Sequence, residues 1–90
     1  MRKKIFKYPF HTPESRSFWI PKGGKILHFG LQADLPTIWV EVEPDAETVL
    51  RNFIIYGTGR LFEAVGLTYI GTVVGHLGQY VWHLYEEGAP

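Results

Sequence analysis

Apolar and polar residues alternate with a period of two along most of this chain. Such spacing is typical of β-strands, because successive side chains of a strand point to opposite faces of the sheet. The clearest run is 37–43, in which Ile38, Val40 and Val42 alternate with threonine, tryptophan and glutamate. One face of that strand is therefore predicted to be buried and the other hydrated. Similar runs cover residues 4–10, 17–20, 25–31, 48–56, 67–74 and 79–86.

Glycine and proline residues separate these runs and mark the turns between them. About seven short strands at a spacing of about 8–12 residues predict an all-β fold, either a small antiparallel barrel or a sandwich. Residues 60–66 are expected to form one short helical or irregular segment. Because a chain of this length builds one core, residues 1–90 are predicted to form a single β-rich domain.

Individual residues predict where some of the strands lie within a sheet. Pro9 has no N–H group to donate, which places the first strand at a sheet edge. Residues 48–56 are apolar on both faces, which predicts a central strand that is buried on both sides. The alternation around Leu27 places it on the same face as Phe29. Gly71 predicts a β-bulge or a close backbone approach.

The composition narrows the classes of function. The chain has no cysteine, so a disulfide framework, a thiolate metal site and a cysteine nucleophile are excluded. The 9 basic and 9 acidic residues cancel, which removes electrostatic support for binding duplex nucleic acid. The same balance weakens the repulsion between copies, so a homodimer is expected. No apolar window of about 18 residues exists, so neither a membrane span nor a signal peptide is predicted, and we expect a cytoplasmic location.

A glycine-rich turn is the strongest candidate for a ligand site. The apolar residues 53–56 run directly into Gly57, Thr58, Gly59 and Arg60. Both glycines can adopt positive φ without steric cost, so their N–H groups are expected to point into one small concavity. With the charge of Arg60, the four residues form a candidate anion cradle. The alternative is a glycine turn that ends a strand and binds nothing.

Catalytic and metal chemistry have little support. The four histidines lack the local spacing of a ligand set, so no metal and no cofactor are predicted. Thr58 lies between glycines but has no identifiable base in the sequence. Glu41 and Glu43 lie two residues apart, and on a strand face such a pair is ordinarily a hydrated stripe. No enzymatic activity is therefore expected.

Protein contact is the better supported class of function. The 16% share of aromatic residues exceeds what a core of this size can hide, and exposed aromatic residues dominate recognition sites. The hydrated face of the strand at 37–43 carries a tryptophan, which is expected to cover a neighbouring element or to contact a partner. The candidate contact residues are Trp19, Trp39, Glu41, Tyr56 and Trp82.

Six segments follow one another in a distinctive order: Ile5-Phe6-Lys7-Tyr8-Pro9, Pro21-Lys22-Gly23-Gly24-Lys25-Ile26-Leu27, Thr37-Ile38-Trp39-Val40-Glu41-Val42, Phe53-Ile54-Ile55-Tyr56-Gly57-Thr58-Gly59, Tyr69-Ile70-Gly71-Thr72-Val73 and Tyr80-Val81-Trp82-His83-Leu84-Tyr85-Glu86. Together they resemble a family of small uncharacterised proteins, a domain of unknown function found largely in bacteriophages and prophages. The resemblance spans nearly the whole chain. It implies a phage origin and assigns neither an activity nor a catalytic residue.

Three functions remain open on these grounds. The first expectation is a small phage-encoded, non-enzymatic binding protein that inhibits a host protein, of the anti-defence type, by protein–protein contact in the cytoplasm of the infected bacterium. The second is an oligomeric sponge that sequesters a small anionic, nucleotide-like signal at the turn of residues 57–60. The third is a structural or housekeeping phage protein whose aromatic residues are all buried.

Overall fold

A computed structural model describes residues 2–11 and 15–88 of the chain. The strands are β1 (Lys4–Pro9), β2 (Arg16–Pro21), β3 (Lys25–Gln32), β4 (Leu35–Val42), β5 (Thr48–Gly57), β6 (Leu67–Val74) and β7 (Val81–Glu87), with a short 3₁₀ helix η1 (His76–Gly78) before the last strand. The prediction of an all-β fold with about seven short strands is confirmed. All seven predicted runs differ from the observed strands by no more than two residues at either end.

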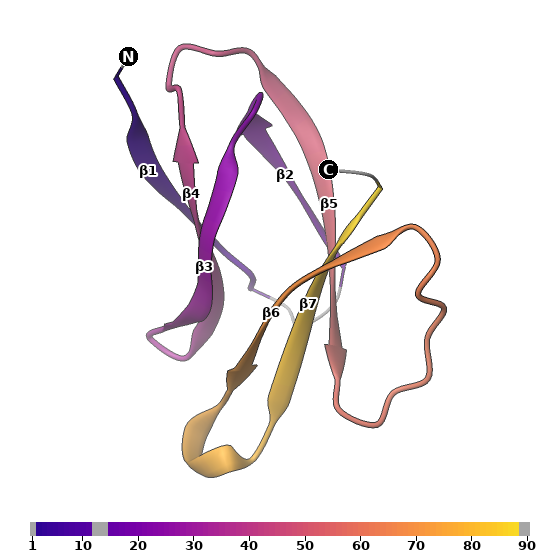
Figure 1. The fold of residues 1–90 in the computed structure, drawn as a ribbon. Coiled ribbons are helices and arrows are strands. Elements are labelled where there is room, and N and C mark those ends of the chain that lie inside the picture. Colours follow the sequence, from indigo (N-terminus) through magenta and orange to yellow (C-terminus); the bar gives the residue numbers. More distant parts are fainter. Residues whose placement is uncertain (1, 12–14, 89–90) are drawn as a thin grey trace.

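The strands form two antiparallel sheets, as Figure 1 shows. One sheet has three strands in the order β1-β4-β3, and the other has four strands in the order β2-β5-β7-β6. The sheets meet where β3 lies against β6. They do not close into a barrel, so of the two predicted architectures the sandwich is the one that fits.

The core lies between the inner faces of the two sheets and is built from aliphatic side chains around a cluster of phenylalanines. Phe10 follows the end of β1, and its N–H group donates to the carbonyl of Pro36 in β4. The ring of Phe10 meets the rings of three phenylalanines edge-on, two from the four-stranded sheet and one from β3. The buried apolar residues are Phe10, Ile20, Phe29, Ile38, Val40, Val42, Phe53, Ile55, Val73 and Leu84.

The positions of two strands test the sequence-based predictions. β1, which ends at Pro9, lies at the edge of the three-stranded sheet as predicted. β5 lies between β2 and β7, which confirms that it is a central strand. The prediction that β5 is buried on both faces is wrong, because Leu50 on its outer face is exposed. The three-stranded sheet covers only the face of β5 that carries Phe53 and Ile55, and Leu50 lies on the outer face of the sandwich.

Two β-bulges change which side chains face the core. The register of β3 shifts between Ile26 and His28, so Leu27 leaves the alternation and is exposed. The prediction that Leu27 shares the buried face of Phe29 is therefore wrong. In β6 the register shifts between Tyr69 and Gly71, which confirms the predicted bulge at that glycine.

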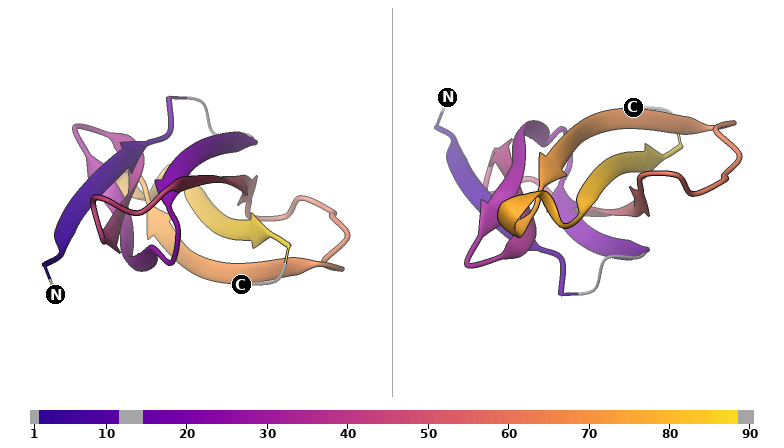
Figure 2. Two further views of the ribbon diagram at one scale, coloured as in Figure 1. Left: turned by 90° about the horizontal axis from the view of Figure 1, so that it is seen from above. Right: turned by 90° about the horizontal axis from the view of Figure 1, so that it is seen from below.

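The connections between strands are short except for residues 58–66, which join β5 to β6. This loop extends beyond the strands on the side of the molecule away from the N-terminus (Figure 2). It contains turns but no helix, so of the two predicted forms the irregular one is observed. The short helical element lies instead at residues 76–78, where a turn was expected, and Leu77 there has a positive φ of 52°.

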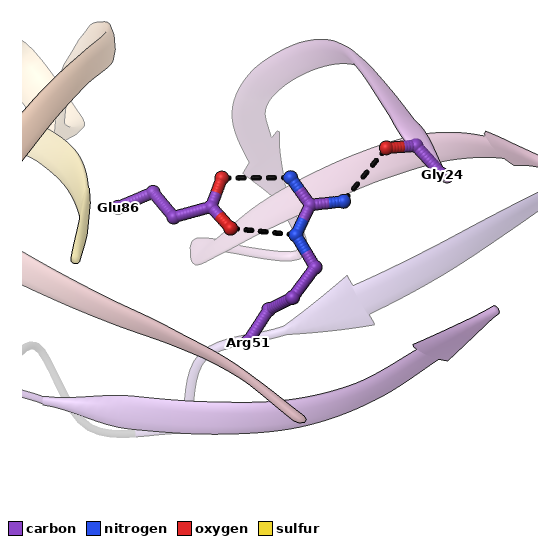
Figure 3. A network of polar contacts seen from close by, with 3 residues as sticks. All are labelled: Gly24, Arg51 and Glu86. Carbon is purple, nitrogen blue, oxygen red and sulfur yellow. Dashed lines mark hydrogen bonds and ion pairs between the residues drawn. The ribbon is translucent and has the colours of Figure 1, made fainter. Parts of the chain in front are cut away.

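A largely buried ion pair joins the neighbouring strands β5 and β7 of the four-stranded sheet at one end of the sandwich (Figure 3). Arg51 on β5 donates two hydrogen bonds to the carboxylate of Glu86 on β7, at 2.6 and 2.7 Å, in the bidentate geometry that guanidinium groups favour. A third N–H of Arg51 donates to the carbonyl of Gly24, in the turn that leads from β2 to β3. Nearby, burial raises the pKa of the Tyr8 hydroxyl above its ordinary value, and the charge of Arg51 opposes that effect.

Candidate functional site

The outer face of the four-stranded sheet carries a row of aromatic and aliphatic side chains. Because the side chains of a strand alternate, Leu50, Ile54 and Tyr56 all leave β5 on the side opposite to the buried Phe53. Residues paired across the sheet share a face, which extends the row to its neighbours on the other strands. We name this surface the aromatic face, and it consists of Trp19, Leu50, Ile54, Tyr56, Phe62, Tyr69 and Tyr85.

Phe62 reaches the aromatic face from the loop of residues 58–66. Its ring stacks on that of Tyr56, with 4.0 Å between centroids and an interplanar angle of 13°. It also contacts Tyr85, whose ring meets those of Tyr56 and Tyr69 edge-on. Such contacts contribute about 0.5–1.5 kcal/mol each beyond simple burial. Phe62 therefore holds one part of a long loop against the sheet and joins the aromatic side chains of three segments.

The aromatic face is exposed and almost free of charge. Trp19 is 63% exposed, Tyr69 is 55% exposed and Leu50 is 48% exposed. Among the described strand residues whose side chains lie on this face, Glu87 at the end of β7 is the only charged one. Depletion of charge with enrichment of tyrosine, tryptophan and phenylalanine is the composition of the buried centre of protein–protein interfaces. The surface therefore has the chemistry of a contact site.

The turn at residues 57–60 differs from the expected anion cradle. Gly59 has a positive φ of 90°, but Gly57 belongs to β5 and does not have one. Two amides that the cradle requires already donate within the chain, from Thr58 to the carbonyl of Val81 and from Arg60 to the carbonyl of Gly57. The expectation that both glycines adopt positive φ and aim their amides at one concavity is wrong. The geometry is that of the alternative interpretation, a turn that ends a strand.

The same turn takes part in a chain of polar side chains. The hydroxyl of Thr58 lies 2.7 Å from Nε2 of His83, and the hydroxyl of Thr72 lies 2.9 Å from Nδ1 of the same ring. Tyr69 continues the chain, with its hydroxyl 2.5 Å from that of Thr72. The sequence analysis identified no base for Thr58. The fold corrects this interpretation, because it places His83 of β7 beside the turn.

A shallow hollow of about 320 Å³ adjoins Thr58 and lies between the turn of residues 57–60 and that of residues 75–80. Its floor includes Tyr80 and Trp82, whose rings stack with centroids 4.2 Å apart. Gly75 makes this stack possible, because the ring of Tyr80 lies directly across its backbone. The amide of Gly75 also donates to the carbonyl of Tyr80 at 2.7 Å.

Replacing Gly75 with alanine is expected to destabilise the fold by about 1–3 kcal/mol, the usual cost of forcing an extra carbon into a packed site. The added Cβ would lie 1.7 Å from Cε2 of Tyr80, so that ring must leave its position on Trp82. Chemical denaturation measures the loss, and the fluorescence of Trp82 reports the change in stacking. Gly78→Ala would meet no neighbour at all but has a φ of 73°, so it serves as a control for backbone strain without overpacking. Equal spectra for the Gly75 variant and the original protein would contradict this account.

The five predicted contact residues do not form one surface. Trp19 and Tyr56 belong to the aromatic face. Trp39 and Glu41 lie on the outer face of the other sheet, where Trp39 is half-buried and packs beside the ring of His28. Trp82 packs against the core and under Tyr80. The predicted set is thus divided between two opposite surfaces and a half-buried position beside the core.

The outer face of the three-stranded sheet is more highly charged than the aromatic face. Lys7 and His28 flank Trp39 across the strands, and Lys25 is paired with Glu41. Charged side chains at the centre of a contact must be stripped of water at a cost that pairing only partly repays. Of the two outer faces, the aromatic face is therefore the better contact surface.

Several residues of the aromatic face escaped the sequence-based prediction. For Leu50, Ile54 and Tyr85 the sequence did contain a signal, namely the alternation of strand faces. Leu50 and Ile54 lie an even number of residues from the predicted contact residue Tyr56, and Tyr85 lies two residues after His83. Phe62 carries none, because it lies in an irregular loop where periodicity has no meaning. Its role appears only in the folded arrangement.

The fold and site define a small antiparallel β-sandwich with one charge-poor aromatic outer face. The family model described as "Domain of unknown function (DUF7352)" matches residues 1–90, and the chain belongs to this family. The prediction of an uncharacterised family is thereby confirmed. No curated protein and no solved structure gave a significant match to the chain. Within the described residues, no helix has the length and apolar character needed to cross a membrane.

Proposed function

We propose that this protein is a binding protein that acts by protein–protein contact through its aromatic face. The observation that carries the proposal is the exposure of Trp19, Leu50 and Tyr69 on a sheet face with almost no charge. Exposed apolar patches of this kind mark interaction sites on soluble proteins. Tryptophan and tyrosine are also the residues that most often dominate the free energy of such contacts.

The identity of the partner follows from the origin that we propose for the chain. We infer a phage or prophage origin from the ordered segments described under the sequence analysis. The partner is then a protein of the bacterial host, and the contact covers a working surface of that protein in the host cytoplasm. Such an inhibitor needs no catalytic step, because occupying the surface is sufficient.

The proposal is tested by affinity capture from the infected host with three forms of the tagged protein. The original chain is expected to retain one dominant host protein. Trp19→Ser is expected to weaken that retention ten-fold or more, because loss of an exposed aromatic anchor at a contact costs about 2 kcal/mol or more. Trp39→Ser serves as the matched control, since it removes the same side chain from the opposite sheet.

The outcomes separate the competing functions. Loss of capture with the Trp39 variant alone would place the contact on the other sheet and overturn the proposal. A small anionic molecule found by mass spectrometry in the purified protein, without any captured host protein, would favour the sponge. A dimer in light scattering that Trp19→Ser dissociates would show that the aromatic face binds a second copy of the chain.

A further inference from the structure

The chain of polar groups at the end of β5 has the order found around activated nucleophiles. Thr58 lies in the turn after β5, His83 lies on β7 and Thr72 lies on β6. The imidazole ring lies between two hydroxyl groups, 2.7 Å from that of Thr58 and 2.9 Å from that of Thr72. A nucleophile within hydrogen-bond reach of a base, with the base oriented by a third group, is the diagnostic arrangement for covalent catalysis.

The hydrogen bonds assign a role to each ring nitrogen. A neutral imidazole has one N–H donor and one acceptor. When Nδ1 carries the proton, it donates a hydrogen bond to the hydroxyl oxygen of Thr72, which in turn donates one to the hydroxyl oxygen of Tyr69. Nε2 is then the acceptor of a hydrogen bond from the Thr58 hydroxyl. This tautomer polarises the Thr58 oxygen and leaves its lone pairs directed away from the ring.

The backbone after Thr58 adds a donor for developing negative charge. Gly59 follows the hydroxyl-bearing residue directly and has a φ of 90°. In the described part of the chain, its amide donates to no backbone carbonyl, whereas the amides on either side of it do. The N–H group of the residue after a nucleophile is a recurrent oxyanion donor in acyl transfer. The exposed guanidinium of Arg60 lies next in the chain.

The hydroxyl of Thr58 can be reached from solvent, because Thr58 is exposed. The stacked rings of Tyr80 and Trp82 do not line this approach, because Trp82 and His83 are consecutive in β7 and their side chains leave the strand on opposite faces. A substrate therefore meets Thr58 and His83 from the outer face of the four-stranded sheet.

We propose that Thr58 is an acyl-accepting nucleophile for activated esters of small carboxylic acids, with His83 as its base. The oxygen of Thr58 attacks the ester carbonyl carbon, and its proton passes to Nε2 of His83. The bond to the leaving alcohol or phenol then breaks, and the leaving oxygen takes the proton back from His83. The product is an ester of Thr58, which hydrolysis by water returns to the free hydroxyl. This reactivity goes beyond the proposed contact function: Tyr69 belongs to both, whereas Trp19 and Leu50 take no part in the reaction.

The test is incubation of the full chain with p-nitrophenyl acetate, followed by peptide mapping of acetylated residues. Thr58 is expected to gain one acetyl group, and the exposed Thr48 at the start of β5 serves as an internal control with the same chemistry. Thr58→Val abolishes this label, while Thr58→Ser retains it. His83→Gln is expected to slow the labelling of Thr58 by about 10²-fold, the usual contribution of a general base.

Circular dichroism of each variant establishes that the sheets are intact. A label on Thr58 no faster than on Thr48, or one that is equally fast in His83→Gln, would overturn the proposal.

Discussion

Replacing Arg51 with methionine is expected to lower the free energy of unfolding by about 3–5 kcal/mol, the cost of leaving one partner of a buried ion pair without its counter-charge. The side chains of Arg51 and Glu86 are only 19% and 11% exposed, so water cannot replace the lost hydrogen bonds (Figure 3). The carbonyl of Gly24 loses its donor as well. A chain of 90 residues has a total stability of roughly 5–14 kcal/mol, so the loss is a large fraction of it.

Two further variants test whether burial of the ion pair causes the expected loss of stability. Lys3→Met breaks the pair with Glu43, whose side chains are 42% and 44% exposed, and is expected to change stability by about 0–1 kcal/mol. The double variant Arg51→Met, Glu86→Leu is expected to recover much of the loss, because an apolar pair of similar size needs no counter-charge. Urea denaturation measures all three. A double variant that is less stable than Arg51→Met alone would contradict the explanation.

The strand positions were predictable because local signals agreed with the global fold. Proline and glycine ended each run where a turn was required, and the period of two identified the buried faces of β1 and β4. Gly71 indicated its bulge because a glycine in the interior of a strand often marks a bulge or a close backbone approach. Leu27 gave no such signal. Its bulge arises in the pairing of β3 with β4, which no window of the sequence contains.

The candidate site was less predictable than the fold, because its contacts join distant parts of the chain. Arg51 and Glu86 lie 35 residues apart, and Thr58 and His83 lie 25 residues apart. Neither pair has a local spacing that distinguishes it from ordinary strand residues. The turn at Gly57 was recognised correctly as the end of a strand. The hydrogen-bond partner of the Thr58 hydroxyl is His83, however, and this residue comes from β7.

The two outer faces of the sandwich explain why an aromatic surplus did not identify the contact surface. Trp39 and Trp19 have the same chemistry, yet only Trp19 is surrounded by uncharged neighbours. What distinguishes them is the set of residues on adjacent strands, and this set depends on the strand order. A contact site on a sheet is a property of the register as much as of the residue types.

Replacing Phe10 with alanine is expected to destabilise the domain by about 3–5 kcal/mol, the range found when a buried phenylalanine is truncated. Phe10 is 1% exposed, and it lies where the chain leaves the three-stranded sheet for the four-stranded one. Its ring meets Phe18, Phe29 and Phe53 edge-on, with centroids 5.1 to 6.2 Å apart. Truncation therefore leaves a cavity that faces both sheets, and neither sheet can close it alone.

The matched control is Leu61→Ala, which removes a large apolar side chain that is 100% exposed in the loop of residues 58–66. It is expected to leave the denaturation midpoint unchanged within the error of the measurement. Phe10→Leu should fall between the two, because it keeps most of the volume and loses only the edge-on ring contacts. If Phe10→Ala were no more damaging than Leu61→Ala, the sheets would not be held together by this ring.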